Sequence, residues 1–258
     1  MASVGTEDSI RVERRGDLKV YHRGEFPVDA LLDALHALGK TLKVSKKSVT
    51  REVRGWVIKE SRPEGRVGCL KRTLLRPRYR RGWAAANYLM RRGIPVPKPV
   101  AFVEKGRYGL IAGNALVSEY LDGYRNVEEH AKELVEQPDA EEAVPRFLLA
   151  LAQAINGLCD TGAYHSDLSG KNIFTRDGET FYFIDLDGVF LHRPLTDARR
   201  MRNHVQVYDS FCDFIDDEFL APFLSRMLPP EHRMRDWLPE VREAQRRRRA
   251  QHLAGQTS

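Results

Sequence analysis

The chain has 258 residues and a formal net charge of +6, from 42 Lys and Arg against 36 Asp and Glu. A charged fraction of 30% beside 42% apolar residues indicates a folded globular protein and excludes an extensively disordered one. Residues 40–81 contain 15 Lys or Arg and three acids, a local charge of +12, so the rest of the chain sums to −6. This polarity excludes a uniformly basic nucleic-acid coat and indicates one cationic region.

The cysteines and the terminal sequence predict a protein of the cytoplasm. Cys69, Cys159 and Cys212 are widely spaced and form no C-x-x-C pair, which argues against a disulfide framework or a zinc cluster. The acidic N-terminal sequence lacks the layout of a signal peptide. The longest apolar run, 147–152, is too short to cross a bilayer.

The first half of the chain is rich in predicted strands. A hairpin is expected around Gly16–Asp17, because apolar and polar residues alternate on both sides of it. Pro27 predicts the start of a helix that Gly39 would cap. The remaining expected elements of this half are strands at 40–45, 48–53 and 55–60, a helix at 79–93, and strands at 99–113 and 115–121, the former bent by a Lys105–Gly106 turn.

The second half has helical periodicity. Helices are expected at 126–137 and 143–158, a strand at 181–186, and further helices, of which the last is a frayed basic helix that runs into a disordered end. A strand-rich half followed by a helix-rich half predicts an α+β protein in two lobes, which we place at residues 1–120 and 121–258.

The strongest chemical signal is H-x-D-x-x-x-x-N, formed by His165, Asp167 and Asn172, with Asp185 at the end of an apolar strand 13 residues later. Phosphoryl transfer needs a carboxylate to position and deprotonate a hydroxyl, and an amide oxygen with a second carboxylate to hold Mg²⁺. A three-residue pattern arises by chance in roughly 3% of chains of this length. The added Asp185 makes coincidence rarer still.

The segments HSDLSGKN and FIDLD resemble the catalytic and metal-binding loops of the protein-kinase-like superfamily. More narrowly, residues 40–190 resemble the lipopolysaccharide core kinases, which phosphorylate Kdo or heptose sugars. That resemblance includes GIPVPKPVAFVE, VSEYLDG, and IDLD in place of Asp-Phe-Gly. It implies a bilobal protein-kinase-like fold, with a β-rich N-lobe and a helical C-lobe, and the use of ATP and Mg²⁺.

Residue by residue, the resemblance implies Asp167 as catalytic base and Asn172 and Asp185 as metal ligands. It implies that Lys59 contacts the α- and β-phosphates of ATP, although a lysine ending an apolar strand could also be a solvated edge charge. His165 is expected to brace the backbone. Lys171 could offset the phosphoryl charge or simply be exposed.

Five further residues are implied to bind the nucleotide. The backbone of Glu119 and Tyr120 matches the hinge that would meet adenine. The turn that covers the phosphates contains Ser45, Lys46 and Ser48 instead of G-x-G-x-x-G. Its N–H groups and lysines could cradle phosphate.

One departure from the family pattern keeps a non-catalytic scaffold open as an alternative. The helix at 79–92 contains no Glu, so the usual partner of Lys59 is missing, and Glu60 and Glu64 are the only acids nearby in sequence. A second alternative is an atypical RIO-like protein serine/threonine kinase, because it would share the same catalytic loop.

Two basic runs, Lys71–Arg81 and Arg246–Arg249, are either solvated faces or contacts for an anionic membrane surface. No nucleic acid is expected, because no stacking aromatic platform accompanies them. We therefore expect an ATP- and Mg²⁺-dependent kinase that phosphorylates a Kdo or heptose hydroxyl of the lipopolysaccharide inner core. Its acceptor would be the lipopolysaccharide core and lipid A glycolipid, at the inner face of the inner membrane.

Overall fold

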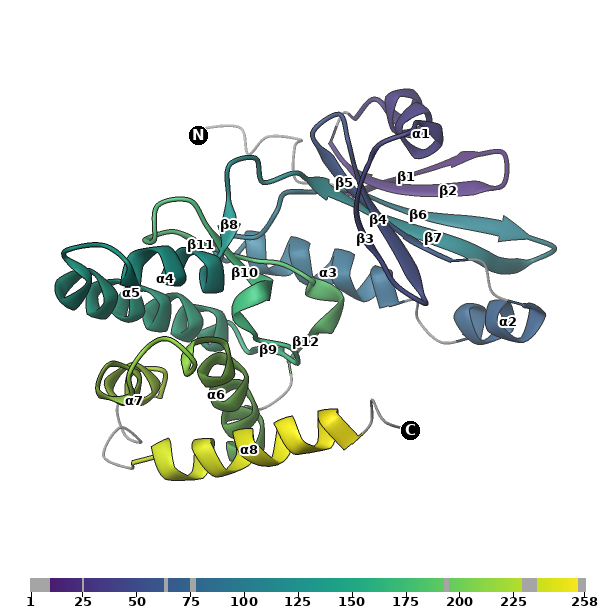
Figure 1. Cartoon of the computed structure of the whole chain (residues 1–258). Helices are drawn as coiled ribbons and strands as arrows, with labels where there is room; N and C mark the ends of the chain where they lie inside the picture. The colour runs from purple at the N-terminus through teal and green to yellow at the C-terminus, as the bar shows by residue number, and fades with distance from the viewer. Residues whose placement is uncertain are drawn as a thin grey trace, which may run out of the picture. The chain divides into compact units, whose positions relative to one another are not determined.

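A computed structural model describes residues 10–24, 26–62, 65–74, 78–192, 195–228 and 236–254 (Figure 1). The chain divides into two compact units. The first comprises Met1–Tyr88 and Pro97–Asp122, and the second comprises Leu89–Val96 and Gly123–Ser258. The expected division at residue 120 treated each lobe as one continuous segment, whereas Leu89–Val96 belongs with the second unit.

The first unit is built on a seven-stranded antiparallel sheet in the order β1-β2-β6-β7-β5-β4-β3. Its strands are β1 (Ile10–Arg15), β2 (Leu18–Arg23), β3 (Lys40–Val44), β4 (Ser48–Val53), β5 (Trp56–Ser61), β6 (Pro99–Arg107) and β7 (Leu110–Glu119). Its helices are α1 (Val28–His36), α2 (Arg66–Leu74) and α3 (Arg78–Met90), whose end enters the second unit. The predicted α+β class is confirmed.

Apolar side chains of the inner strands cover both faces of the sheet. One face packs against α1 through Val28, Leu31 and Ala34. The other receives Tyr79 and Trp83 of α3, which cluster with Phe102 of β6. Burial of these large side chains, at about 25 cal/mol per Å² of apolar surface, holds the helices on the sheet.

Two turn predictions were wrong. The β6–β7 hairpin turns at Tyr108 and Gly109, with φ angles of 50° and 75°, and not at Lys105–Gly106, where the register shifts instead. Positive φ at two adjacent residues matches the twist of a tight hairpin, which Gly109 makes accessible. Gly39 is not the cap of α1, because the C-cap residue of this helix is Ala37. Glycine is needed at position 39 for another reason: a Cβ atom there would lie 2.3 Å from the Glu52 carbonyl oxygen.

The second unit is mainly helical. Its helices are α4 (Val127–Val135), α5 (Ala140–Asp160), α6 (Asp197–Phe211), α7 (Asp217–Arg226) and α8 (Leu238–Ala254). Its strands are β8 (Arg125–Asn126), β9 (Ala163–His165), β10 (Ile173–Thr175), β11 (Phe181–Phe183) and β12 (Val189–Leu191), and two 3-10 turns are η2 (Gly170–Asn172) and η3 (Leu186–Gly188). The expected strand at 181–186 is only three residues long, because Asp185 leaves the extended conformation.

The core of this unit forms around α5, which buries the apolar stripe that includes Phe147, Leu151 and Ile155. The Phe147 ring lies 5.8 Å from that of Phe181 and 6.5 Å from that of Phe211. Two small sheets, β11-β10-β8 and β12-β9, hold the loops between the helices. The short strands therefore serve to fix loops.

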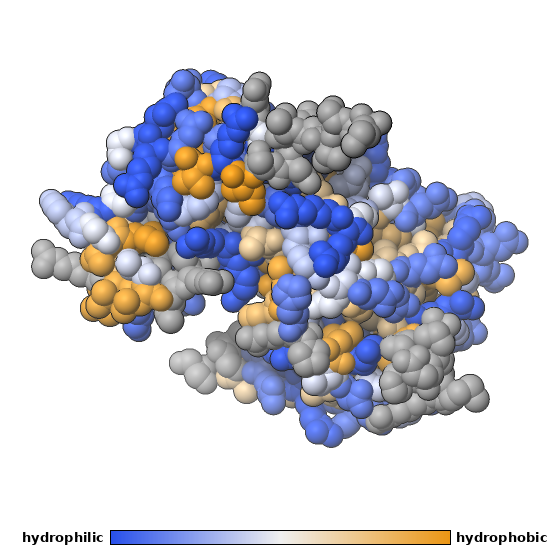
Figure 2. Space-filling model, turned by 180° about the vertical axis from the view of Figure 1, so that it is seen from behind, coloured by the Kyte–Doolittle hydropathy of each residue, from blue (hydrophilic) through white to orange (hydrophobic). Residues whose placement is uncertain are grey.

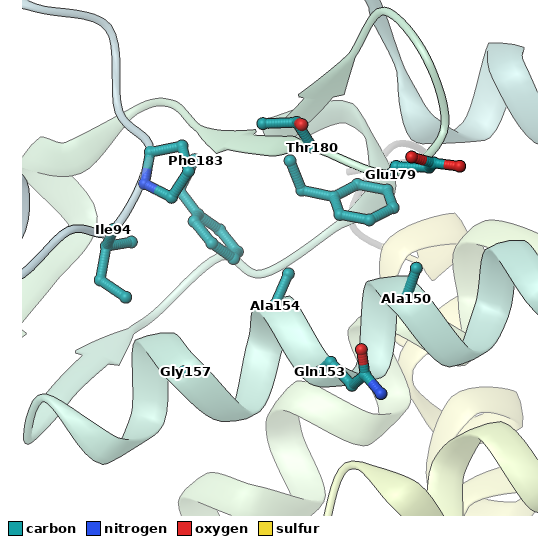
Figure 3. Close-up of a pocket in the computed structure, with 10 residues that line it drawn as sticks. Ile94, Ala150, Gln153, Ala154, Gly157, Glu179, Thr180 and Phe183 are labelled. Atoms are coloured by element: carbon teal, nitrogen blue, oxygen red, sulfur yellow. The ribbon is translucent and has the colours of Figure 1, made fainter.

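The segment Leu89–Val96 packs within the second unit. The Phe183 backbone N–H donates to the Pro95 carbonyl oxygen at 3.1 Å. An apolar hollow of about 270 Å³ lies beside this contact, lined by Ile94, residues of α5 and Phe183. Figure 3 shows the side chains that line it. None of the predicted site residues lines it.

The basic helix expected near the C-terminus is α8, which is not frayed over its described residues but packs against α6. Arg249 binds Asp209 and Asp213, and Arg248 binds Asp209. No helix within the described ranges is long and apolar enough to cross a membrane.

Candidate active site

Asp167 lies on the loop between β9 and η2, where its side chain is exposed. Asn172, at the end of η2, donates from Nδ2 to the Asp167 carboxylate at 3.0 Å and to the Asp167 carbonyl oxygen at 2.9 Å. The amide nitrogen thus fixes the carboxylate. The amide oxygen of Asn172 has no hydrogen bond to the described residues, so it is available to a ligand.

His165 joins the catalytic loop to the loop that carries Asp185. Its ring is almost completely buried. Nδ1 accepts the Asp167 N–H at 3.2 Å, and Nε2 donates to the Ile184 carbonyl oxygen at 3.0 Å. Burial lowers the pKa of His165 below its ordinary value of 6.5, and this arrangement requires the neutral ring. His165 therefore braces the backbone, as the sequence indicated.

Gln206 of α6 brackets Asp167 from both sides. Its Oε1 accepts the Leu168 N–H at 3.0 Å, and its Nε2 donates to the Ser166 carbonyl oxygen at 2.9 Å. The side chain is only 6% exposed, so both hydrogen bonds form away from solvent. One amide therefore sets the backbone on either side of the predicted base.

A second contact with α6 fixes the next turn of the loop. Ser210 accepts the Gly170 N–H at 2.8 Å and donates to the Gln206 carbonyl oxygen at 3.0 Å. A Cβ at Gly170 would lie 3.0 Å from the Cβ of Ser210. Glycine is thus required for the close approach of the loop to α6.

Asp185 has left-handed backbone angles, φ 56° and ψ 42°. Aspartate tolerates this region better than most residues, and such strain persists at sites that a fold over-determines. The Gly188 N–H donates to the Asp185 carbonyl oxygen at 3.0 Å, and Ser166 donates from both N–H and Oγ to the Gly188 carbonyl oxygen. The Asp185 loop is therefore tied directly to the catalytic loop.

The other polar residues of these loops have different surroundings. Lys171 is 73% exposed at its side chain, and its Nζ lies 4.0 Å from a carboxylate oxygen of Glu128. Asp187 is 1% exposed, so it lies inside the unit and not on its surface. Of the two charges, only that of Lys171 is presented to solvent.

In the first unit, α3 presents an aromatic ring to Lys59 where the sequence lacks a glutamate. The Lys59 ammonium lies 5.6 Å from the centre of the Tyr79 ring, and Tyr79 is 5% exposed. A cation over a ring face is stabilised by about 0.5–2 kcal/mol. Tyr79 is therefore an α3 side chain that contacts Lys59.

The turn at residues 45–48 closes on itself. The Ser45 hydroxyl accepts the N–H groups of Lys47 and Ser48 at 3.2 and 3.0 Å, and it lies 2.9 Å from the Ser48 hydroxyl. Two of the backbone N–H groups expected to cradle phosphate are therefore engaged. The exposed side chains of Lys46 and Lys47 remain as positive charges at this turn.

The predicted hinge residues are also engaged within their own unit. The Glu119 N–H donates to the Lys98 carbonyl oxygen at 3.0 Å, and the Tyr120 N–H donates to the Gly55 carbonyl oxygen at 2.8 Å. A Glu119 carboxylate oxygen accepts the Lys98 N–H at 2.8 Å. Glu119 thus has a structural role at the end of β7.

Comparison with known proteins decides the family. The sequence model described as "Lipopolysaccharide kinase (Kdo/WaaP) family" matches residues 35–218. The chain belongs to this family. A solved structure described as WaaP in complex with acyl carrier protein has 19% identity and a TM-score of 0.63, covering 85% of this chain and 91% of that chain. No curated protein sequence matches significantly.

The predicted recognition and the kinase-like fold are confirmed by these matches. The protein is a kinase of the lipopolysaccharide kinase family and hence a phosphotransferase. The structural neighbour, at its low identity, supports the fold alone. Gln206 and Ser210 are the site residues that sequence reasoning missed, because they lie about forty residues from the catalytic motif.

The four arginines of the second basic run, Arg246–Arg249, all pair with acids. Arg246 and Arg247 pair with Glu243, while Arg248 and Arg249 pair with acids of α6 and the turn after it. The hydrogen bonds that Arg249 donates to Asp213 and Asp209 raise the pKa of its guanidinium group. The same pairing lowers the pKa of the Asp213 carboxyl group. Arg248 and Arg249 therefore attach α8 to α6 and to the turn that follows it.

Proposed function

We propose that this protein transfers the γ-phosphoryl group of ATP to a Kdo or heptose hydroxyl of the lipopolysaccharide inner core. Asp167 is the catalytic base: its carboxylate orients the acceptor hydroxyl and takes its proton. The observation that carries the proposal is the fixed and exposed carboxylate of Asp167, held by Asn172 and bracketed by Gln206. Family membership supports the lipopolysaccharide acceptor.

Asn172 and Asp185 would hold Mg²⁺. An amide oxygen and a carboxylate suit this ion, which binds oxygen donors and keeps several waters and substrate phosphates as ligands. Within the described residues no group of three or more His, Cys, Asp or Glu side chains is arranged to hold a metal. A small donor set of this kind fits Mg²⁺, which would neutralise charge on the phosphates when bound.

Lys59 would contact the α- and β-phosphates, with Tyr79 against its ammonium group. The phosphate-covering turn would act through the side chains of Lys46 and Lys47, since the hydroxyl of Ser45 already occupies two of its backbone donors. Ser45 and Ser48 would shape this turn. Glu119 and Tyr120 would border adenine. The enzyme would work at the inner face of the inner membrane, where its glycolipid acceptor is made.

The test compares core oligosaccharide from a deletion strain complemented with wild type, Asp167→Asn or Asp139→Asn. Asp139 is the matched control, because it is an exposed carboxylate whose side chain caps no backbone group. Mass spectrometry should find the phosphate lost in the deletion strain and the Asp167→Asn strain and restored by wild type and Asp139→Asn. An unchanged phosphate count in the deletion strain contradicts the lipopolysaccharide acceptor.

Purified protein separates the two alternatives. Transfer of labelled phosphate from ATP to dephosphorylated core oligosaccharide is expected, with a requirement for Mg²⁺. Autophosphorylation with no sugar product would favour an atypical protein kinase. Wild-type complementation by Asp167→Asn, together with no thermal shift by Mg-ATP, would favour a scaffold.

A further inference from the structure

Helix α2 exposes a stripe of large apolar side chains. Val67, Leu70 and Leu74 are 69%, 48% and 74% exposed. Their spacing of three and four residues places them on one side of the helix. Lys71 is exposed four residues after Val67 and lies on the same side.

Helix α2 is anchored to the sheet through Thr73, which lies beside the apolar stripe. The Thr73 hydroxyl donates to the Cys69 carbonyl oxygen at 2.8 Å and accepts the Ile111 N–H of β7 at 2.8 Å. This contact fixes the direction in which the apolar stripe points. A surface helix of a soluble domain normally buries its apolar stripe against the core, whereas α2 exposes its apolar stripe to solvent.

The tip of the β6–β7 hairpin adds an aromatic residue to this region. Tyr108 is 90% exposed, and the Arg107 guanidinium lies 5.4 Å from its ring centre. The tip is close to α2 in space, because Ile111, the second residue of β7, donates its N–H to the Thr73 hydroxyl. An exposed tyrosine next to an arginine is typical of the level of lipid headgroups.

The sequence around α2 is strongly basic, and Asp17, an acid beside the hairpin, lies 3.9 Å from the ammonium group of Lys105. Residues 65–81 contain seven Lys or Arg and no acid. Figure 2 shows apolar surface over α2, at the left of the view. Positive charge beside the stripe complements the negative charge of an anionic bilayer. The stripe protrudes from the helix surface, and a bilayer can accommodate protruding apolar side chains because lipid molecules move apart around them.

We propose that α2 and the β6–β7 tip form a membrane-docking surface. Val67, Leu70, Leu74 and Tyr108 enter the headgroup region of an anionic bilayer, and Lys71 and Arg107 contact its phosphates. The inference deepens the proposed function, because it brings the enzyme to its glycolipid acceptor. Binding itself requires neither ATP nor catalysis.

The test is co-sedimentation of the full-length protein with vesicles of phosphatidylglycerol and phosphatidylcholine, or of phosphatidylcholine alone. Wild type should bind the anionic vesicles, with binding that weakens as salt rises. The variant Val67→Ser/Leu70→Ser/Leu74→Ser should lose about tenfold or more in partition coefficient, because several apolar side chains no longer enter the interface. The matched control is Ile10→Ser/Val12→Ser/Val44→Ser, three apolar residues of the same unit with 43%, 51% and 57% exposure.

A second measurement does not depend on removing apolar residues. In a Leu70→Trp variant, tryptophan emission should shift to shorter wavelength when anionic vesicles are added, and a Tyr108→Ser variant should bind more weakly than wild type. Equal binding by the stripe and control variants, or no emission shift at Leu70→Trp, overturns the proposal. A wild-type dimer that the stripe variant converts to monomer also overturns it, since the stripe would then contact a second copy.

The outcome is separable from that of the catalytic proposal. Asp167→Asn should bind vesicles as wild type does. The stripe variant should phosphorylate a delipidated, water-soluble core oligosaccharide at the wild-type rate. Loss of activity on this soluble acceptor would contradict a role confined to docking.

Discussion

The Nδ2 of Asn172 lies 3.0 Å from a carboxylate oxygen of Asp167. The predicted metal ligand and the predicted base are thus joined directly. The amide can perform both tasks because its nitrogen donates and its oxygen accepts. Asparagine is consequently better suited to this position than aspartate.

We expect Asn172→Asp to separate the two tasks. The new carboxylate keeps an oxygen for Mg²⁺ but places negative charge against Asp167, so kcat should fall by about 100-fold or more while the Mg²⁺ requirement persists. Steady-state kinetics at several Mg²⁺ concentrations provide the measurement, with Asn172→Ala as the comparison that removes both atoms. Full activity of Asn172→Asp would limit Asn172 to metal binding.

Gln206 should act through Asp167. Replacing it by Leu leaves the Leu168 N–H and the Ser166 carbonyl without their partners, at a cost of about 1–3 kcal/mol. We expect kcat to fall by about 10- to 100-fold and the KM for ATP to change little. Gln245→Leu, another buried glutamine, is the matched control and should leave kcat near wild type.

A double-mutant cycle tests this relationship more sharply. In an Asp167→Asn background the additional Gln206→Leu change should have almost no effect on residual activity, because the group that Gln206 positions is already absent. Additive losses would show instead that Gln206 acts only on general stability.

Lys59 and Tyr79 predict a specific pattern in ATP binding. Tyr79→Leu removes the ring over which the ammonium lies and should raise the KM for ATP by about 2- to 30-fold, corresponding to about 0.5–2 kcal/mol. Tyr79→Phe keeps the ring and should retain the wild-type KM. Similar KM values for the Leu and Phe variants would argue that the ring packs against Phe102 without affecting Lys59.

His165 should make stability depend on pH. Its pKa is lowered in the folded protein by burial, so the unfolded chain binds more protons once the pH falls below the ordinary value of 6.5. Its contribution is therefore complete above that pH and is lost as the pH decreases toward the folded pKa. Thermal unfolding at pH 7.5 and 5.5 should give a smaller pH effect for His165→Gln than for wild type. His36→Gln, at an exposed position, should keep the full effect.

Arg249 should stabilise the second unit modestly. Arg249→Ala removes contacts with Asp209 and Asp213, but the arginine side chain is 43% exposed, so solvent screening limits the loss to about 1 kcal/mol. The expected decrease in Tm is about 2–4 °C, diminishing in high salt. Arg246→Ala, at a more exposed arginine, should have little effect. An equal decrease for both variants would contradict the special position of Arg249.

The sequence was sufficient to predict the part of the candidate site whose residues are close together along the chain. His165, Asp167 and Asn172 lie within eight residues, so one motif predicted their loop, and the apolar alternation predicted most strands. The β6–β7 turn was missed because Lys105–Gly106 has turn composition, whereas the actual turn uses Tyr108 in a backbone region that tyrosine seldom adopts.

The support of the site could not be predicted from the motif, because it comes from a different helix. One signal was present: Asn203, Gln206 and Ser210 recur at spacings of three and four residues in α6, which indicates a polar stripe on one face. Only the structure shows that Gln206 and Ser210 of this stripe contact the catalytic loop. Similarly, α2 was not predicted, because it overlaps the basic run Lys71–Arg81, which we interpreted only through its charge.

The attachment of α8 to α6 has a consequence for biosynthesis. Arg249 follows Asp209 by forty residues, so the ribosome releases α6 well before the arginine that fastens it. Until α8 has been synthesised, Gln206 and Ser210 lie on a helix, α6, that lacks its contacts with α8. We therefore expect the nascent chain to gain a fully ordered catalytic loop late in translation, and a chain that ends before α8 to be a preferred substrate for cellular proteases.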